Sequence, residues 1–419
     1  MTSDPTRGQN LAIVKTLTYL MFAMFAMTTD SVGVIIPEVI RTLRLSLTAA
    51  GTFQYATMAG IAVAGLLLGS LADRFGRRRT IVTGLALFAS ACLLLAAGNT
   101  LWWFAVLLAL SGLAIGIFKT GALALIGDIS TSTREHTSIM NAAEGFFGLG
   151  AIAGPALLTQ LLTAGLSWKW LYAIAGAMCA ILVVLASLVR YPETPRRTAS
   201  AAAAAGGSVA ALRNPYVVAF SAGAFLYVAV EAAIYVWMPT LLAHYTGPAA
   251  PVAAYSLSIF FLLRAAGRFL GAWVLRQAPW QLVLMLFSGG ILACFAATVI
   301  GGVPWAVFVL PLSGLFMSVM YPTINSKGIS CAHKGDHGAA AGIILFFTCV
   351  SAVVSPLMIA AAGDAFGDII YGYWAAAAFA AVLFGASVLN WAMNPTRAVL
   401  EARDRTEYVS ARPPARTTV

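Results

Sequence analysis

Long apolar segments recur along the whole of this 419-residue chain. Each run of 18 or more residues is long enough to cross about 30 Å of hydrocarbon as an α-helix. Only 10% of the residues are charged and the mean hydropathy is +0.87, whereas soluble domains carry roughly 25% charged residues. Because backbone groups in lipid must be satisfied within the structure, and the short alternating segments of a β-barrel are not seen, the sequence predicts an all-α membrane protein.

Twelve spans are expected, in two sets of six. Residues 191–214, rich in Ala, Gly, Ser, Pro and Arg, interrupt the apolar pattern and are typical of a flexible linker. We therefore expect an N-terminal six-helix bundle over 1–190, a cytoplasmic linker over 191–214, a C-terminal six-helix bundle over 215–393 and a cytoplasmic basic tail over 394–419. The expected spans are 12–36, 50–72, 80–97, 102–126, 137–164, 170–190, 215–243, 252–275, 280–300, 304–330, 337–362 and 369–393.

The net charge of +10 is explained by membrane orientation and does not indicate a nucleic-acid partner. Arginines concentrate in alternate loops, in the linker and in the tail, so the positive-inside rule predicts that both termini are cytoplasmic. The leader before the first span is polar and has no cleavage site, which predicts that the first span is retained. The expected location is a bacterial-type inner membrane, where the basic tail can also contact anionic lipid.

A glycine- and arginine-rich loop follows the second span and reads GSLADRFGRRR over residues 69–79. It resembles the signature loop of the major facilitator superfamily, G-x-L-x-D-R-x-G-R-[KR], which implies two six-helix bundles that rock about a central site. An aspartate among arginines can form a latch that breaks when the bundles move. A weaker copy, with Arg268, closes the eighth span. The expected gating residues are Gly69, Asp73, Arg74, Gly76, Arg77, Arg78 and Arg268.

The second half also resembles the L-fucose:proton symporter family. Residues 316–329 read FMSVMYPTINSKGI, which is similar to that family's FMSxxYPTIxSxGI in span 10. Residues 227–231 are similar to its span 7 segment, and residues 267–269 to its GRF in span 8. The resemblance implies symport of a sugar with protons.

The departures from that family fall on its charged residues. Gly33 stands where the family carries a coupling aspartate in span 1, and Asp30 lies one helical turn earlier, where the family has asparagine. Lys119 replaces the coupling glutamate of span 4, and Glu144 replaces a sugar-contacting glutamine of span 5. The proton route of the family therefore does not transfer unchanged.

Five ionisable residues lie well inside apolar spans, namely Asp30, Lys119, Glu144, Glu231 and Arg264. Such residues face a cavity or a partner, because a central charge costs about 2.5–3.5 kcal/mol on translocon scales. We expect Asp30, Lys119 and Glu144 to share a cavity, with Lys119 between two carboxylates. Two alternatives remain open: Lys119 and Glu144 form a structural bridge, and Arg264 extends toward the cytoplasmic edge.

Polar and aromatic side chains complete the expected solute site. Tyr227 in span 7 and Tyr321 with Asn325 in span 10 are suited to sugar stacking and hydroxyl binding, and Asn141 precedes Glu144 by three residues. Tyr235 and Trp237 are weaker candidates, because aromatic residues near span ends often form interfacial belts. The expected substrate-binding or coupling residues are Asp30, Lys119, Asn141, Glu144, Tyr227, Glu231, Tyr321 and Asn325.

These features predict a secondary transporter and not an enzyme. The chain has no phosphate-binding loop of the G-x-x-x-x-G-K-[ST] type, so transport must be driven by a gradient. We expect proton-coupled symport of a sugar or sugar derivative, and Lys119 favours an anionic one such as a sugar acid. The alternatives are a drug/proton antiporter and an organic-anion transporter of the same superfamily. No metal or other cofactor is expected, and one chain contains both bundles, which predicts a functional monomer.

Overall fold

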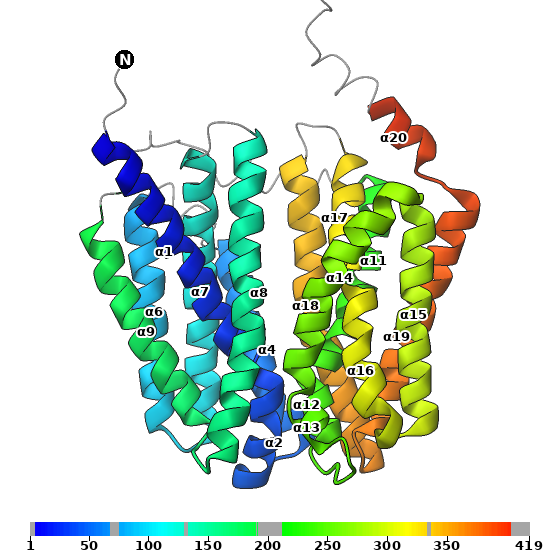
Figure 1. Ribbon diagram of the computed structural model, residues 1–419, viewed down its shortest axis with the longest axis horizontal. Coiled ribbons are helices and arrows are strands. Elements are labelled where there is room, and N and C mark those ends of the chain that lie inside the picture. Colours follow the sequence, from blue (N-terminus) through cyan, green and yellow to red (C-terminus); the bar gives the residue numbers. More distant parts are fainter. Residues whose placement is uncertain are drawn as a thin grey trace, which may run out of the picture.

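The computed structural model describes residues 5–67, 75–129, 133–189, 191, 212–332 and 337–403, and every regular element in these ranges is a helix. The helices form two bundles that stand side by side (Figure 1). The N-terminal end of the chain and helix α20, Arg397–Arg403, lie at the same end of the molecule. The described helices thus form the all-α, two-bundle architecture that the sequence predicts.

The first bundle contains the helices up to residue 188. Its first span is interrupted, so that two helices share one apolar segment, and a short helix precedes its second span. The elements are α1 (Pro5–Thr29), α2 (Val32–Leu43), α3 (Leu47–Ala50), α4 (Thr52–Leu67), α6 (Arg77–Ala97), α7 (Leu101–Ile129), α8 (Thr133–Thr163) and α9 (Lys169–Leu188).

The second bundle begins at residue 215, and two of its spans are also interrupted. Asn214 caps the first helix of this bundle through hydrogen bonds from the backbone amides of the next turn. The elements are α11 (Pro215–Ala232), the π-helix η1 (Ala233–Trp237), α12 (Met238–Leu242), α13 (Ala250–Ala254), α14 (Ser256–Gln277), α15 (Trp280–Gly301), α16 (Val303–Met317), α17 (Met320–Ser330), α18 (His337–Phe366) and α19 (Ile370–Met393).

Eleven apolar segments of the described chain are long enough to cross a membrane. Helix α4, which covers 16 residues up to the end of a described range, packs along α7 and supplies the twelfth span. The ends of most spans lie within a few residues of the prediction. Spans 1, 7 and 10 each consist of separate helices or change helix type.

The two bundles repeat the same helix pairing. In the first bundle α1 packs on α8, α4 on α7 and α6 on α9, and in the second α11 packs on α18, α14 on α16 and α15 on α19. Glycine permits close backbone contact at matching places: a Cβ on Gly112 would lie 2.0 Å from the Thr57 carbonyl oxygen, and one on Gly314 would lie 2.4 Å from that of Phe260. Small residues at such crossings are typical of membrane helices, whose association depends on close packing.

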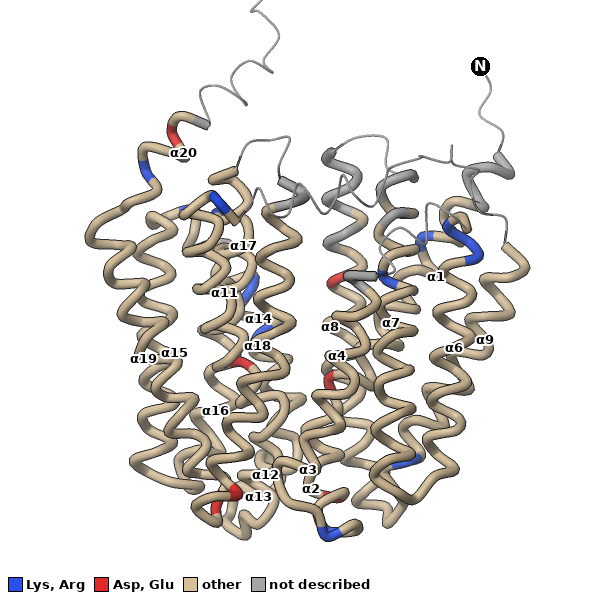
Figure 2. Tube along the Cα trace, turned by 180° about the vertical axis from the view of Figure 1, so that it is seen from behind, with Lys and Arg blue, Asp and Glu red and all other residues tan. Residues whose placement is uncertain are grey.

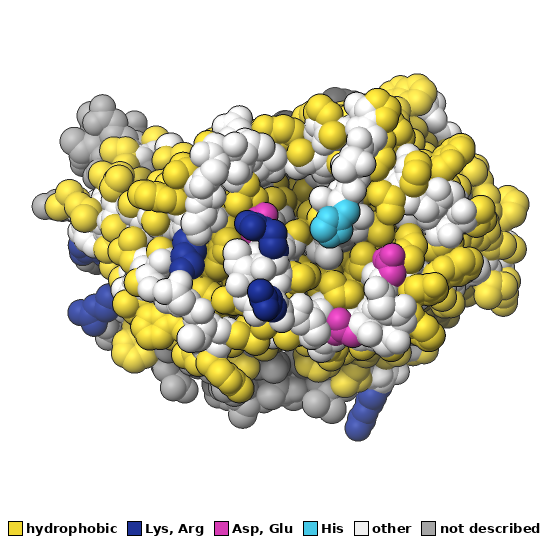
Figure 3. Space-filling model, turned by 90° about the horizontal axis from the view of Figure 1, so that it is seen from below, with side chains coloured by type: hydrophobic (Ala, Val, Ile, Leu, Met, Phe, Trp, Pro, Cys, Tyr) yellow, Lys and Arg dark blue, Asp and Glu magenta, His cyan; other side chains and the backbone are white. Residues whose placement is uncertain are grey.

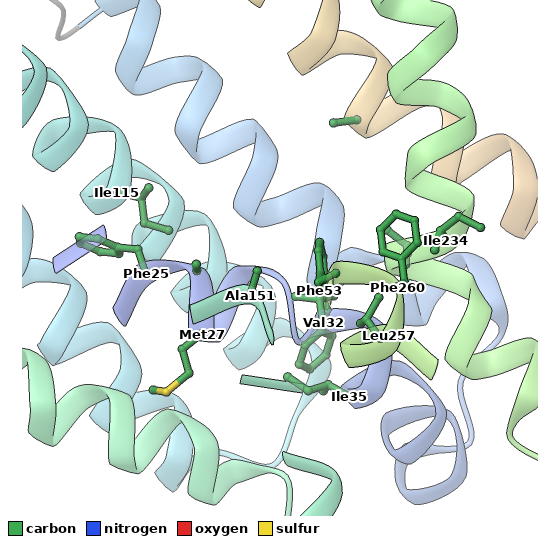
Figure 4. Packing of buried hydrophobic residues seen from close by; sticks show 14 of the residues in the cluster. Phe25, Met27, Val32, Ile35, Phe53, Ile115, Ala151, Ile234, Leu257 and Phe260 are labelled. Carbon is green, nitrogen blue, oxygen red and sulfur yellow. The ribbon is translucent and has the colours of Figure 1, made fainter. Parts of the chain in front are cut away.

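The bundles contact each other at the end opposite the N-terminus. There α2 packs on η1 and α12, α3 and α4 pack on α18, and α8 packs on α14. Figure 4 shows buried residues of both bundles, including Val32 and Phe53 from the first and Ile234 and Phe260 from the second, as parts of one apolar cluster. Close packing therefore seals this end, because side chains of both halves fill the space between them.

Candidate functional site

Three helix interruptions lie next to the ionisable residues of the interior. Residues 30 and 31 form a turn between α1 and α2, so Asp30 sits at the break itself. The π-helix η1 begins two residues after Glu231, and residues 318 and 319 separate α16 from α17. Interrupted helices leave backbone groups and side chains free for a ligand, and π-helical segments are frequent at functional sites. Figure 2 shows acidic and basic positions at mid-height in both bundles.

A buried ion pair lies at the centre of the part of the site that the second bundle supplies. Arg264 Nη1 of α14 binds Glu231 Oε1 of α11, and the Glu231 side chain is 9% exposed. The Tyr227 hydroxyl, one turn before Glu231, lies 3.1 Å from Glu231 Oε1 and 3.1 Å from the carbonyl oxygen of Met317, the last residue of α16. The Arg264 Nε atom has no hydrogen-bond partner within the described residues. The sequence left open that Arg264 extends toward the cytoplasmic edge, but the structure places it in this pair.

Asp30 reaches the same region from the first bundle. Its Oδ2 atom accepts a 3.0 Å hydrogen bond from the Thr29 hydroxyl, and its carboxyl group interacts electrostatically with Arg264, Glu231 and Lys119. A carboxylate from one half thus faces an arginine and a carboxylate from the other. Because the Asp30 carboxyl group interacts electrostatically with Arg264 and Glu231 of the opposite bundle, a change in its charge alters how strongly the halves attract each other.

Lys119 does not form the ion pair that one interpretation of the sequence suggested. In the described residues no ion pair joins it to Glu144; its Nζ atom lies 5.5 Å from the centre of the Phe147 ring, at cation–π distance. Lys119 is half-buried and Glu144 is exposed. Both cation and carboxylate therefore remain available to a solute.

Tyr321 and Asn325 lie on α17, immediately after the break in span 10. The Tyr321 ring stacks on Tyr227 with 6.2 Å between ring centres, and Asn325 has a buried Oδ1 atom without a hydrogen-bond partner in the described chain. The expected residues of spans 7 and 10 are thus adjacent.

The exposed Arg268 of α14 interacts electrostatically with Glu144 and Glu231. Asn141 belongs to α8, and its side chain lies outside the described set.

Two contacts of the site were not foreseen from the sequence. Gln54 of α4 is fully buried, and its Nε2 atom lies 3.4 Å from the hydroxyl of Tyr235 in η1, across the two bundles. A polar amide inside an apolar span is a signal that could have identified Gln54. Trp237, a candidate for the membrane interface, is instead fully buried and donates to the Pro356 carbonyl oxygen at 3.1 Å.

Most of the expected gating loop lies outside the described residues, including Gly69, Asp73 and Arg74. Gly76 has a φ of 87°, which favours glycine, so it forms the turn expected before α6. Arg77 begins α6, and the Arg78 guanidinium binds the carbonyl oxygen of Ser187 at the end of α9. The described residues contain no group of three or more His, Cys, Asp or Glu side chains suited to a metal ion.

Two helix bundles that contact each other at one end and carry ionisable residues at helix interruptions are typical of a multi-pass membrane transporter. The sequence model of the Major Facilitator Superfamily matches residues 18–356, so the chain belongs to this superfamily. It is 24% identical over 382 residues to the glucose/galactose transporter of Brucella abortus biovar 1 (strain 9-941), covering 87% of this chain and 91% of that protein.

Solved structures share the fold. A variant of the E. coli fucose:proton symporter FucP superposes with a TM-score of 0.63 at 21% identity, over 91% of this chain and 99% of that one. The nucleoside transporter NupG superposes with a TM-score of 0.73 at 15% identity, over 91% and 99%. The resemblance to the superfamily and the expected fold are thereby confirmed, and the protein is a transporter and not an enzyme.

Proposed function

We propose that this transporter couples protons to the uptake of a small polar solute, a sugar or sugar derivative, by alternating access. The observation that carries the proposal is the electrostatic interaction of Asp30, at the break in the first span, with the Glu231–Arg264 pair of the opposite bundle. A carboxylate that takes up a proton loses its electrostatic attraction to a nearby arginine. Such an exchange would link proton binding to the movement of one bundle against the other.

The solute class is supported by the polar and aromatic groups next to this pair. Tyr227 and Tyr321 provide stacked aromatic faces, and the Asn325 amide oxygen can accept a hydrogen bond from a hydroxyl group. The Brucella relative is named a glucose/galactose transporter, and FucP a fucose:proton symporter. Lys119, which forms no ion pair with a carboxylate among the described residues, favours an anionic sugar such as a sugar acid.

The membrane arrangement belongs to the same proposal. Arginines concentrate at the end that carries the N-terminus, so we place that end in the cytoplasm of a cell with a bacterial-type inner membrane. Since the bundles contact each other at the opposite end, the described arrangement would admit solute from the cytoplasmic side. Residues 191–214 would link the two bundles, and one chain would suffice for transport.

Two experiments test the function. A thermal-shift screen of the purified protein against sugars, sugar acids and other organic anions identifies the ligand, because a molecule that binds the folded state raises its melting temperature. Proteoliposomes with an imposed pH gradient then test coupling: the identified solute should enter together with protons and dissipate the gradient. If sugars and sugar acids give no flux while lipophilic cations do, the protein is a drug/proton antiporter and the proposal is wrong.

A further inference from the structure

The end at which the bundles meet contains a hydrogen-bonded contact between distant parts of the chain. Asp364 lies near the end of α18, in the second bundle. Its Oδ1 atom accepts a 2.7 Å hydrogen bond from the backbone amide of Leu47, and its Oδ2 atom accepts a 2.8 Å bond from that of Thr48. Leu47 and Thr48 begin α3, in the first bundle. One carboxylate therefore satisfies two backbone donors of the opposite bundle.

The local backbone is shaped to receive this carboxylate. The Ser46 hydroxyl accepts from the Ala49 amide, which leaves the amides of Leu47 and Thr48 for Asp364. The neighbouring Gly363 allows close approach, because a Cβ there would lie 2.5 Å from Leu47 Cδ1. Figure 3 looks onto this end and shows acidic, basic and histidine side chains near the middle of the face.

We propose that Asp364 with the Leu47 and Thr48 amides, here named the Asp364 latch, holds this end of the transporter closed and must open in each transport cycle. Hydrogen bonds to a charged acceptor are stronger than neutral ones, and both oxygens are used. Because Asp364 is exposed, water competes for these bonds and keeps the latch reversible. The inference rests on the alternating access proposed above and assigns a residue that selects between its two states.

The test measures the opening of this end directly. Spin labels on Thr42→Cys and Thr246→Cys, both exposed and in opposite bundles, report the separation by pulsed electron resonance in a background without the five native cysteines. In Asp364→Ala the population with the longer distance should grow, with a roughly three- to tenfold fall in the ratio of closed to open forms. Asp368→Ala is the matched control, because Asp368 has the same charge but bonds to Ile370 of its own bundle; its distribution should equal that of the unsubstituted chain.

A second variant removes a donor instead of the acceptor. Leu47→Pro deletes one amide, and the backbone permits it because Leu47 is the first helical residue and Ser46 before it is extended (φ −67°, ψ 163°). Leu47→Ala keeps the amide and controls for the lost side chain. Leu47→Pro should shift the distances as Asp364→Ala does, and combining the two should add little.

If Asp364→Ala and Leu47→Pro both give the distribution of the Asp368→Ala control, the latch does not exist. If Asp364→Ala fails to purify as a monodisperse species, Leu47→Pro against Leu47→Ala decides alone. The measurement needs no solute, so its failure would leave the proposed solute and proton coupling to the uptake experiment, and failure of uptake would leave the latch intact.

Discussion

At the scale of single residues, the interior charged side chains are of two kinds: one ion pair, and side chains that remain available to a solute. Glu231 and Arg264 neutralise each other within the second bundle, with Tyr227 completing the bonding of the carboxylate. Lys119 and Glu144 are not joined to each other in the described chain. We therefore expect substitutions of Glu231 or Arg264 to lower stability, and substitutions of Lys119 to change solute binding instead.

The paired residues should show their coupling in stability. Arg264→Gln leaves the Glu231 carboxylate buried without its partner, so we expect a loss of about 3 kcal/mol, seen as a lower melting temperature. The double variant Glu231→Gln/Arg264→Gln should lose less than Arg264→Gln alone, because no uncompensated charge remains.

The exposed pair between Arg397 and Glu401 supplies the control for this comparison. Glu401→Gln should change stability by less than about 1 kcal/mol, since exposed ion pairs contribute little. If Glu231→Gln/Arg264→Gln is less stable than both Glu231→Gln and Arg264→Gln, then Glu231 and Arg264 act independently.

Lys119 should matter to solute charge and not to folding. Lys119→Gln removes the cation beside Phe147, so we expect uptake of an anionic solute to lose roughly tenfold in apparent affinity, about 1.4 kcal/mol, with the melting temperature little changed. Lys119→Arg should retain most of the affinity. Unchanged uptake of the anionic solute by Lys119→Gln would assign this lysine a peripheral role.

At the scale of helices, the interruptions of spans 1, 7 and 10 determine where side chains and backbones meet. The turn at Asp30 lets α2 lean on η1, where Gly33 packs directly on the backbone of Tyr235. The resemblance to the L-fucose:proton symporter family implies a coupling aspartate at the position of Gly33, but this contact leaves no room for a larger side chain here.

Gly33→Ala should therefore disturb the packing of α2 on η1. The added Cβ would lie 2.2 Å from the Tyr235 carbonyl oxygen, so we expect a loss of about 1–3 kcal/mol in thermal melts, and more for Gly33→Asp. Gly145→Ala is the control, because a Cβ at this α8 position meets no atom within 4 Å and alanine favours helix. Equal melting temperatures for the two alanine variants would contradict the contact.

At the scale of the whole molecule, the bundles are in contact at one end and the ionisable residues lie beyond that contact. The hydrogen bonds that the described residues make between bundles, Gln54–Tyr235, Thr159–Ala254, Ser258–Ile152 and the Asp364 latch, are all at the end opposite the N-terminus. Access to the site is therefore expected from the N-terminal end.

Two positions of one helix should reveal this asymmetry. In α14, Arg268 is exposed and interacts with Glu144 of the other bundle, whereas Ser258 is buried and bonds to Ile152 of the other bundle. A cysteine at Arg268 should react with a charged maleimide at least about tenfold faster than one at Ser258, because only the first is open to water. Similar rates at the two positions would mean that both ends are equally open.

The sequence determined the membrane fold because hydrocarbon thickness and backbone satisfaction allow few structures for twelve long apolar segments. Most span ends and the superfamily resemblance were readable for that reason, and the span 10 motif drew attention to Tyr321 and Asn325 as candidate site residues. Asp30 and Glu231 were identifiable as charges inside apolar runs.

Only the tertiary structure decided how those charges are paired. Arg264 pairs with Glu231, and Lys119 lies beside the Phe147 ring. Gln54 contacts Tyr235 of the other bundle. Each side chain bonds to the partner that the neighbouring helix places within reach. Asp364 meets residues more than 300 positions earlier, a contact that no local pattern encodes. The length of an apolar segment can be read from the sequence alone. Which side chains pair depends on which segments pack together and on the depth of each side chain in the membrane.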